Sequence, residues 1–149
     1  MERIYITTDD KKWSPEDISP AFSGQEVVVM EKMDGENTNI YPDHFHARSI
    51  QSKDHPSRHW VKSLWVQIRK DIPDGWRICG ENVFAEHSIH YKRLSTYFYV
   101  FGIWDQNNWC LTWDDTIDVC ENLGLQTVPV LWIGIWNEQK VKSCYTGIS

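Results

Sequence analysis

The stretch Val27-Val28-Val29-Met30-Glu31-Lys32-Met33-Asp34-Gly35-Glu36-Asn37 joins an apolar run to a short polar turn. Three consecutive valines are typical of a strand and Asp-Gly of a tight turn, so we expect Lys32 at a strand end beside that turn. A lysine held there is predicted to be partly desolvated and fixed in position, which suits a nucleophilic amine. The local chemistry therefore makes Lys32 a candidate nucleophile.

The segments on either side of this turn are predicted to be short elements. Residues 26–41 have the pattern of a β-hairpin or tight strand-turn-strand, and residues 1–24 that of a lead-in segment. Downstream, the spacing of apolar side chains predicts a helix within residues 56–70. A turn at 71–75 then leads to a strand at 76–79, which continues into Gly80-Glu81-Asn82.

The second half of the chain predicts a central strand, a helix and a last strand. The aromatic run 97–105 is strongly β-prone. Thr112 is the expected N-cap of a helix that ends at Leu123 before Gly124, and residues 128–133 are expected to form a strand interrupted by Pro129. Because strands outnumber helices and are mostly joined by turns, we predict an α+β fold with mostly antiparallel sheets and flanking helices.

Length and composition limit the class of protein. A chain of 149 residues with 41% hydrophobic residues is expected to form one domain over residues 1–149. Its net charge of -6 argues against bulk electrostatic coating of nucleic acid but leaves room for a local basic groove. The four cysteines lack zinc-type spacing, and we expect free thiols, a cytoplasmic location and no membrane association.

The histidines and glycines carry no familiar ligand motif. His44 and His46 alternate as on a strand, and His87 and His90 are spaced as helical neighbours, but neither pair has a third ligand at suitable spacing. We expect exposed or hydrogen-bonded histidines and assign no metal ligands. No glycine-rich phosphate loop is present, so a nucleotide has to be held by side chains on strands.

Three segments, in order, resemble one enzyme family. Residues 32–37 resemble the K-x-D-G-x-N nucleophile motif of covalent nucleotidyltransferases, in particular ATP-dependent RNA ligases. Residues 80–91 resemble the family's G-E-N segment followed by H-S-I-x-Y, and residues 98–105 resemble its adenine-stacking strand. The resemblance implies a ligase-type nucleotidyltransferase domain that uses ATP with Mg²⁺ or Mn²⁺, acts on RNA 5′-phosphate and 3′-hydroxyl ends, and works as a monomer.

The resemblance also implies a role for each matching residue. Lys32 is the implied nucleophile, with Asp34 as an orienting carboxylate. Glu81 is expected to accept hydrogen bonds from the ribose, and Phe101 to stack on adenine. The remaining expected nucleotide-binding residues are Arg48 at sugar or phosphate, Asn37 near the phosphates and Glu31 near the adenine edge. By residue type alone, Phe101 is more often a core aromatic, and Arg48, Asn37 and Glu81 are ordinary surface residues.

The end of the chain departs from the family pattern. An E-G-x-V-type strand, whose glutamate helps to place the metal, and a K-x-K-type strand are expected after the Phe101 strand, and neither is present. Lys140 and Lys142 precede the expected glutamate motif and are not assigned to the phosphates. We therefore expect a truncated domain. A non-catalytic nucleotide- or RNA-binding module, a DNA ligase and a capping-type nucleotidyltransferase remain alternatives.

Overall fold

The computed structural model describes residues 15–47 and 56–146. The described chain forms two compact units. The larger unit contains Met30–Val130, and the smaller unit combines the described residues before Met30 with those after Val130. No helix in the part of the chain that the structure describes is long and apolar enough to cross a membrane.

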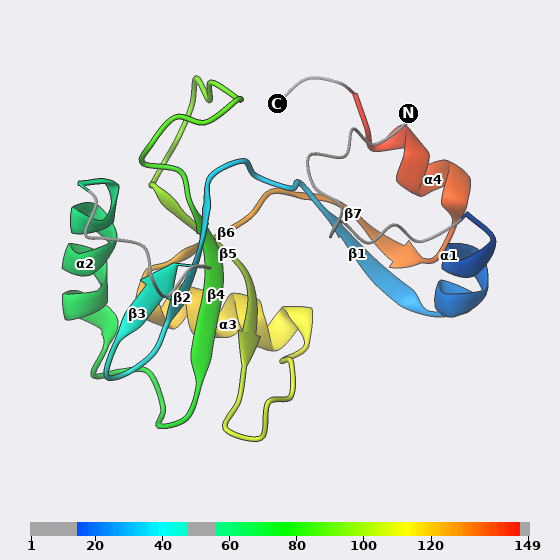
Figure 1. The fold of residues 1–149 in the computed structure, drawn as a ribbon. Helices are drawn as coiled ribbons and strands as arrows, with labels where there is room; N and C mark the ends of the chain where they lie inside the picture. Colours follow the sequence, from blue (N-terminus) through cyan, green and yellow to red (C-terminus); the bar gives the residue numbers. More distant parts are fainter. Residues whose placement is uncertain (1–14, 48–55, 147–149) are drawn as a thin grey trace. The chain divides into compact units, whose positions relative to one another are not determined.

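The larger unit is built on a five-stranded sheet with the order β3-β2-β4-β5-β6 (Figure 1). The strands are β2 Glu36–Ile40, β3 Phe45–Ala47, β4 Arg77–Asn82, β5 Phe98–Trp104 and β6 Gln126–Thr127. The pairs β2–β3, β2–β4 and β4–β5 are antiparallel, and only β5–β6 is parallel. Together with its helices, this sheet confirms the predicted α+β class with mostly antiparallel strands.

Two helices of the larger unit, α2 Ser57–Ile68 and α3 Trp113–Leu123, pack on the sheet through their apolar side chains. Val61 of α2 and Cys120 of α3 join one buried cluster with Ile40, Ile78 and Phe98 of the strands. The predicted ends of α3 are confirmed. The Thr112 hydroxyl accepts a hydrogen bond from the Asp115 N–H at 3.2 Å, and Gly124 ends the helix with φ +67°.

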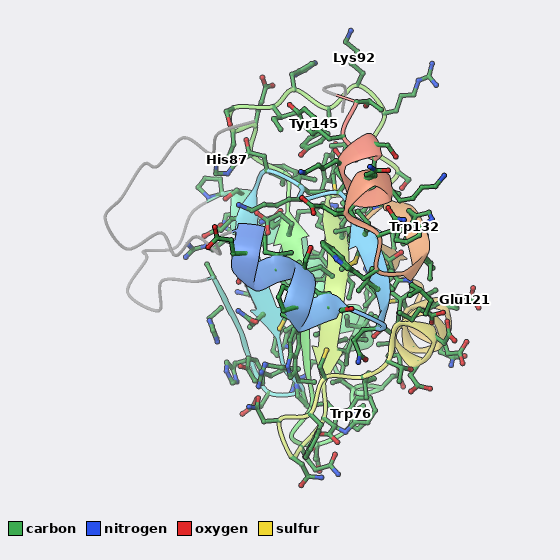
Figure 2. The ribbon with its side chains drawn as sticks, turned by 90° about the vertical axis from the view of Figure 1, so that its right-hand side faces the viewer. Trp76, His87, Lys92, Glu121, Trp132 and Tyr145 are labelled. Atoms are coloured by element: carbon green, nitrogen blue, oxygen red, sulfur yellow. The ribbon has the colours of Figure 1, made fainter. Side chains whose placement is uncertain are left out.

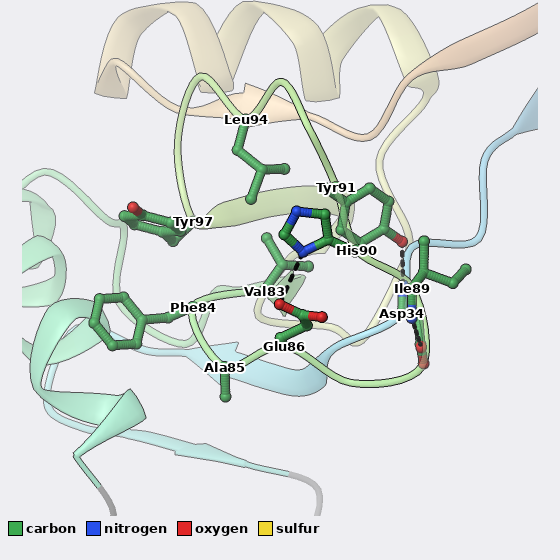
Figure 3. A pocket seen from close by; sticks show the side chains of 10 residues that line it. All are labelled: Asp34, Val83, Phe84, Ala85, Glu86, Ile89, His90, Tyr91, Leu94 and Tyr97. Carbon is green, nitrogen blue, oxygen red and sulfur yellow. Dashed lines mark hydrogen bonds and ion pairs between the residues drawn. The ribbon is translucent and has the colours of Figure 1, made fainter. Parts of the chain in front are cut away.

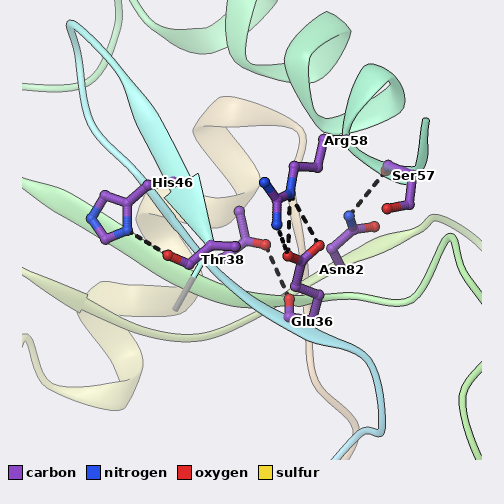
Figure 4. Close-up of polar contacts among 7 residues, drawn as sticks. Glu36, Thr38, His46, Ser57, Arg58 and Asn82 are labelled. Atoms are coloured by element: carbon purple, nitrogen blue, oxygen red, sulfur yellow. Dashed lines mark hydrogen bonds and ion pairs between the residues drawn. The ribbon is translucent and has the colours of Figure 1, made fainter. Parts of the chain in front are cut away.

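The start of α2 is tied to the two central strands (Figure 4). Arg58 donates to the Glu36 carboxylate, with Nε 3.2 Å from Oε1, and the two side chains form an ion pair. The buried amide of Asn82 donates to the Ser57 carbonyl at 3.1 Å. These contacts hold the end of β4 in place, directly after Glu81.

A β-bulge divides the side chains of β5 between two faces. Gly80 pairs with Val100 and Cys79 pairs with Gly102, so Phe101 is the extra residue of the bulged strand. The extra residue shifts the alternation, which lets Val100 and Ile103 share the helix-covered cluster. Tyr99 and Phe101 belong instead to a second cluster with Met33, Val83 and Val128. The bulge thus places Phe101 in the same cluster as the residue after Lys32.

The smaller unit contains α1 Pro15–Phe22, α4 Glu138–Ser143, and β1 Glu26–Met30 and β7 Val130–Ile135 except for the terminal residues Met30 and Val130. The hairpin predicted over residues 26–41 is wrong, because β1 pairs with β7 whereas β2 pairs with β3 and β4. Residues 31–35 therefore link strands of two different sheets. The strand predicted at 128–133 begins at Val130, since Val128 is buried in the second cluster and donates its N–H to the Val100 carbonyl at 2.8 Å.

Candidate active site

The link between β1 and β2 presents alternate side chains to the core and to solvent. Met33 is buried in the second cluster at 6% exposure, while Lys32 is exposed. The prediction that Lys32 is partly desolvated is therefore wrong for the chain as it stands. Because β1 and β2 belong to separate sheets, no paired hairpin partner covers the lysine. Its side chain is instead accessible from solvent, at a point anchored by its buried neighbour.

Asp34 anchors the segment that contains the H-S-I-x-Y match. Its Oδ2 accepts hydrogen bonds from the Ser88 N–H at 2.9 Å, the Ser88 hydroxyl at 2.5 Å and the Ile89 N–H at 3.2 Å. These bonds, the one from the Ser88 hydroxyl above all, lower the pKa of Asp34 below its ordinary value. In return, the Tyr91 hydroxyl accepts the Asp34 N–H at 2.7 Å.

Gly35 and Glu81 join the turn to β4. Glu81 Oε1 accepts the Gly35 N–H at 3.0 Å, and a Cβ at Gly35 would lie 2.4 Å from the Asn82 carbonyl oxygen. Only glycine allows this approach to the strand. Burial raises the pKa of the Glu81 carboxyl, opposed by the Gly35 hydrogen bond and by the positive charge of Lys32. Lys32, Asp34 and Glu81 are thus brought to one turn.

The other predicted nucleotide-binding residues have different positions. Asn37 lies opposite Glu81 in the β2–β4 register, and its side-chain carbonyl accepts from the Asn39 amide at 3.3 Å. Glu31 donates its N–H to the Pro129 carbonyl at 2.9 Å. Arg48 lies outside the described residues, so its predicted role is not placed.

Phe101 is half-buried beside a polar atom without a partner. Trp113 packs on the same second cluster, and its indole Nε1 is buried with no hydrogen-bond partner in the described chain. An unpaired buried donor is costly in a folded protein.

The histidines behave as expected from their spacing. His44 Nδ1 lies 2.7 Å from Asp43 Oδ1, His46 Nδ1 lies 2.8 Å from the Ala47 carbonyl oxygen, and His90 Nδ1 lies 2.8 Å from Glu86 Oε2. Within residues 15–47 and 56–146, no three histidine, cysteine or acidic side chains form a metal-binding group.

Sequence reasoning missed the anchoring role of Ser88, Ile89 and Tyr91. The signal that finds them is the H-S-I-x-Y match itself. A hydroxyl and two consecutive N–H groups in a loop suit a carboxylate. Their partner lies 54 and 55 positions away, however, and only the fold reveals that it is Asp34.

The sequence and the fold of this chain are both similar to those of RNA ligases. A sequence model of the RNA ligase family matches residues 25–148. No curated protein matches the sequence. A structure of the Naegleria gruberi RNA ligase with PPi is 19% identical, with a TM-score of 0.69, over 89% of this chain and 44% of that one. A lysine-to-alanine mutant of that ligase with ATP and Mn is 18% identical, with a TM-score of 0.65, over 83% of this chain and 41% of that one.

These matches cover most of this chain, whereas the chain spans less than half the length of the ligase structures. At this level of identity the structures establish the shared fold. The family match includes the nucleophile motif, the G-E-N and H-S-I-x-Y segments and the Phe101 strand. The resemblance inferred from those motifs is confirmed, and the chain belongs to the RNA ligase family.

Proposed function

We propose that this chain binds ATP and is adenylylated at Lys32, as part of an RNA ligase that joins 5′-phosphate to 3′-hydroxyl RNA ends. The observation that carries the proposal is the turn at 32–35, where an exposed lysine begins a turn that the Glu81 and Asp34 carboxylates hold through Gly35 and Ser88. Residues 1–149 are proposed to act as one nucleotidyltransferase domain.

The first step is displacement at the α-phosphorus of ATP. The lone pair of Lys32 Nζ, after the ammonium has lost a proton to solvent, forms a bond to phosphorus, and the bond to the pyrophosphate oxygen breaks. Lysyl-AMP and pyrophosphate result. An RNA 5′-phosphate oxygen then displaces Lys32, and a 3′-hydroxyl finally displaces AMP to form the phosphodiester.

The chain supplies positioning and electrostatic groups for this chemistry. We assign Phe101 to stack on adenine and Glu81 to the ribose. Asn37, Arg48 and Glu31 are the other proposed nucleotide contacts. Asp34 orients the turn through Ser88, which fixes the backbone two residues from the nucleophile.

Asp34 and Glu81 also supply the oxygen donors that Mg²⁺ and Mn²⁺ prefer. Because Glu81 is assigned to the ribose, we propose Asp34 alone as the chain's own contribution to holding a divalent ion, together with solvent and phosphate oxygens. When bound, the ion supplies charge that offsets the negative charge of the phosphates. Glu81 interacts electrostatically with Lys32 and holds its turn against β4 through the Gly35 N–H.

The compartment is proposed to be reducing and cytoplasmic. All four cysteines are free thiols, and Cys79 and Cys120 are buried. Burial raises the pKa of both thiols to about 11, which keeps them protonated and unreactive. The chain is proposed to act as a monomer on RNA ends.

A non-catalytic nucleotide-binding module is the second candidate, favoured by the exposure of Lys32. The test is incubation with ATP labelled at the α-phosphate and a divalent ion, followed by addition of 5′-phosphorylated RNA. The ligase proposal expects label on the protein that then passes to RNA. Binding of ATP with no labelled protein favours the module and contradicts the ligase proposal.

A further inference from the structure

A pocket of about 120 Å³ lies beside the proposed active site, beneath the segment that joins β4 to β5 (Figure 3). Val83, Leu94 and Ile89 give it an apolar lining, and Phe84 and Tyr97 stand at one side. Glu86 and His90 lie across it and pair with each other at 2.8 Å. This volume is below the roughly 300–1,000 Å³ of usual small-molecule sites, so the pocket can hold at most a group the size of one ring system.

Two aromatic rings of the pocket are open to solvent. Phe84 is 44% exposed and Tyr97 is 39% exposed. Their centroids are 5.1 Å apart at an interplanar angle of 72°, and Trp60 packs edge-on against Tyr97 at 5.4 Å. Edge-to-face packing fixes the orientation of the rings, and their exposed fractions leave part of each ring accessible. Such rings are platforms on which unpaired bases stack.

The pocket adjoins the nucleophile turn. Asp34 lines it, as do Ile89 and Tyr91, and all three take part in the hydrogen bonds that hold the turn. A ligand in the pocket therefore contacts residues that position the turn of Lys32. It is in contact with the same segment that fixes Asp34.

The carboxylates of Asp34 and Glu86 line the pocket, so the phosphate of a bound nucleotide has to lie outside it, toward cations of the same segment. Lys92 and Arg93 are exposed and follow Tyr91 in the same segment, and Lys92 extends outward from its tip (Figure 2). The Glu86 carboxylate lies 2.8 Å from His90 Nδ1. Because the whole chain carries a net charge of -6, local cations of this kind have to provide the phosphate contacts.

We propose that this pocket holds the base of an unpaired nucleotide at an RNA end, stacked on the face of Phe84 with its edge toward Tyr97, and with its phosphate outside the pocket toward Lys92 and Arg93. The inference rests on the proposed ligase function and adds a site for the acceptor that is separate from the adenine-stacking residue Phe101. The base does not have to be of one kind, because every base offers a π-face.

The test uses the full chain and a single-stranded, 5′-phosphorylated RNA with 2-aminopurine at the first or the last nucleotide. Stacking quenches this base, so the expected result is quenching at one of the two ends on binding. Phe84→Leu is expected to weaken RNA binding roughly 5- to 100-fold, the range of one base–aromatic stack. Phe84→Trp is expected to restore it, and Trp109→Leu, which removes a 73% exposed ring elsewhere, to leave it unchanged.

Three outcomes overturn the inference. The first is that 2-aminopurine is quenched at neither end of the RNA, and the second is that Phe84→Leu binds RNA as tightly as the unaltered chain. The third is that Phe84→Leu loses ATP-dependent labelling to the same extent as it loses RNA binding. The last outcome assigns the pocket to ATP. Labelling of the unaltered chain by ATP is scored separately, so a failure of the ligase proposal is distinguished from a failure of this pocket.

Discussion

The carboxylate of Asp34 accepts both the N–H and the hydroxyl of Ser88, at 2.9 Å and 2.5 Å, across 54 positions of sequence. This pair joins the nucleophile motif to the H-S-I-x-Y segment. A substitution at Ser88 is therefore expected to change the position of the turn that carries Lys32. The two motifs act as one structural unit, and neither is fully positioned without the other.

Ser88→Ala is predicted to raise the pKa of Asp34 toward its ordinary value of ~3.9, because the Ser88 hydroxyl is the main cause of the lowering. Asp34 contributes stability above its unfolded-state pKa, and this contribution is lost as pH falls through the lowered folded-state value. The variant should be less stable than the unaltered chain at pH 7, by up to about 1 kcal/mol at this solvent-exposed site, with a smaller difference in acid.

Carboxyl titration by NMR and urea unfolding at two pH values check this prediction. Ser63→Ala is the matched control, since its hydroxyl donates to the His59 carbonyl in α2 at 3.1 Å. Identical Asp34 titration in both variants would contradict the role of Ser88.

Gly35→Ala is predicted to destabilise the larger unit by about 1–3 kcal/mol, the usual cost of forced overpacking. The added Cβ would lie 2.4 Å from the Asn82 carbonyl oxygen and 2.9 Å from Val83 Cγ1. The displaced turn should also slow labelling by ATP. Thermal unfolding and labelling rates measure the two effects.

Gly24→Ala is the control for the glycine substitution. Gly24 has a positive φ of +74° but no atoms within 4 Å of its Cβ direction. It should lose stability from backbone strain and keep its labelling rate. A normal labelling rate in folded Gly35→Ala would show that the turn tolerates movement.

For Glu81→Gln, the free energy of unfolding relative to that of the unaltered chain is predicted to increase as pH rises. Burial raises the pKa of Glu81, so its favourable contribution is present below the unfolded-state value of ~4.3 and is lost as pH rises through the folded-state value. Glutamine keeps an oxygen for the Gly35 N–H and carries no charge. Urea unfolding at pH 4 and pH 7 tests this, and a pH-independent difference is the contrary result.

How much of this could be predicted from sequence depends on the range of the interactions. The limits of α3 follow from local capping by Thr112 and Gly124, and β4 and β5 from local β propensity, so these predictions are confirmed. The partner of β1 was predicted wrongly because the adjacent apolar runs suggest a hairpin, whereas the pairing strand β7 lies a hundred residues away. Helix α4 was not predicted.

In the candidate site, too, local features were predicted from the sequence and long-range contacts were not. Lys32, Glu81 and Asn37 were recognised from motifs, and the fold brings them to one turn and its neighbouring strands. The exposure of Lys32 and the Asp34–Ser88 pair depend on which sheets flank the turn, and local pattern does not report that. Likewise, the bulge that re-aims Phe101 arises from register between β4 and β5.

Phe101→Leu is predicted to weaken ATP binding roughly 5- to 100-fold, since it removes a stacking ring but keeps most of the apolar volume in the second cluster. Calorimetry with ATP measures the change. Trp109→Leu serves as the control, because it removes an aromatic ring that is 73% exposed elsewhere in the unit. Equal ATP affinity in the two variants would remove Phe101 from the nucleotide site.

The central claim concerns the bond formed at Lys32. Intact-mass analysis followed by peptide mapping, after incubation with ATP and Mg²⁺ or Mn²⁺, measures that bond directly. The predicted result is one AMP on the peptide that contains Lys32, absent in Lys32→Ala and retained in the control Lys62→Ala. No adduct on the unaltered chain, or an adduct that persists in Lys32→Ala, would contradict the account.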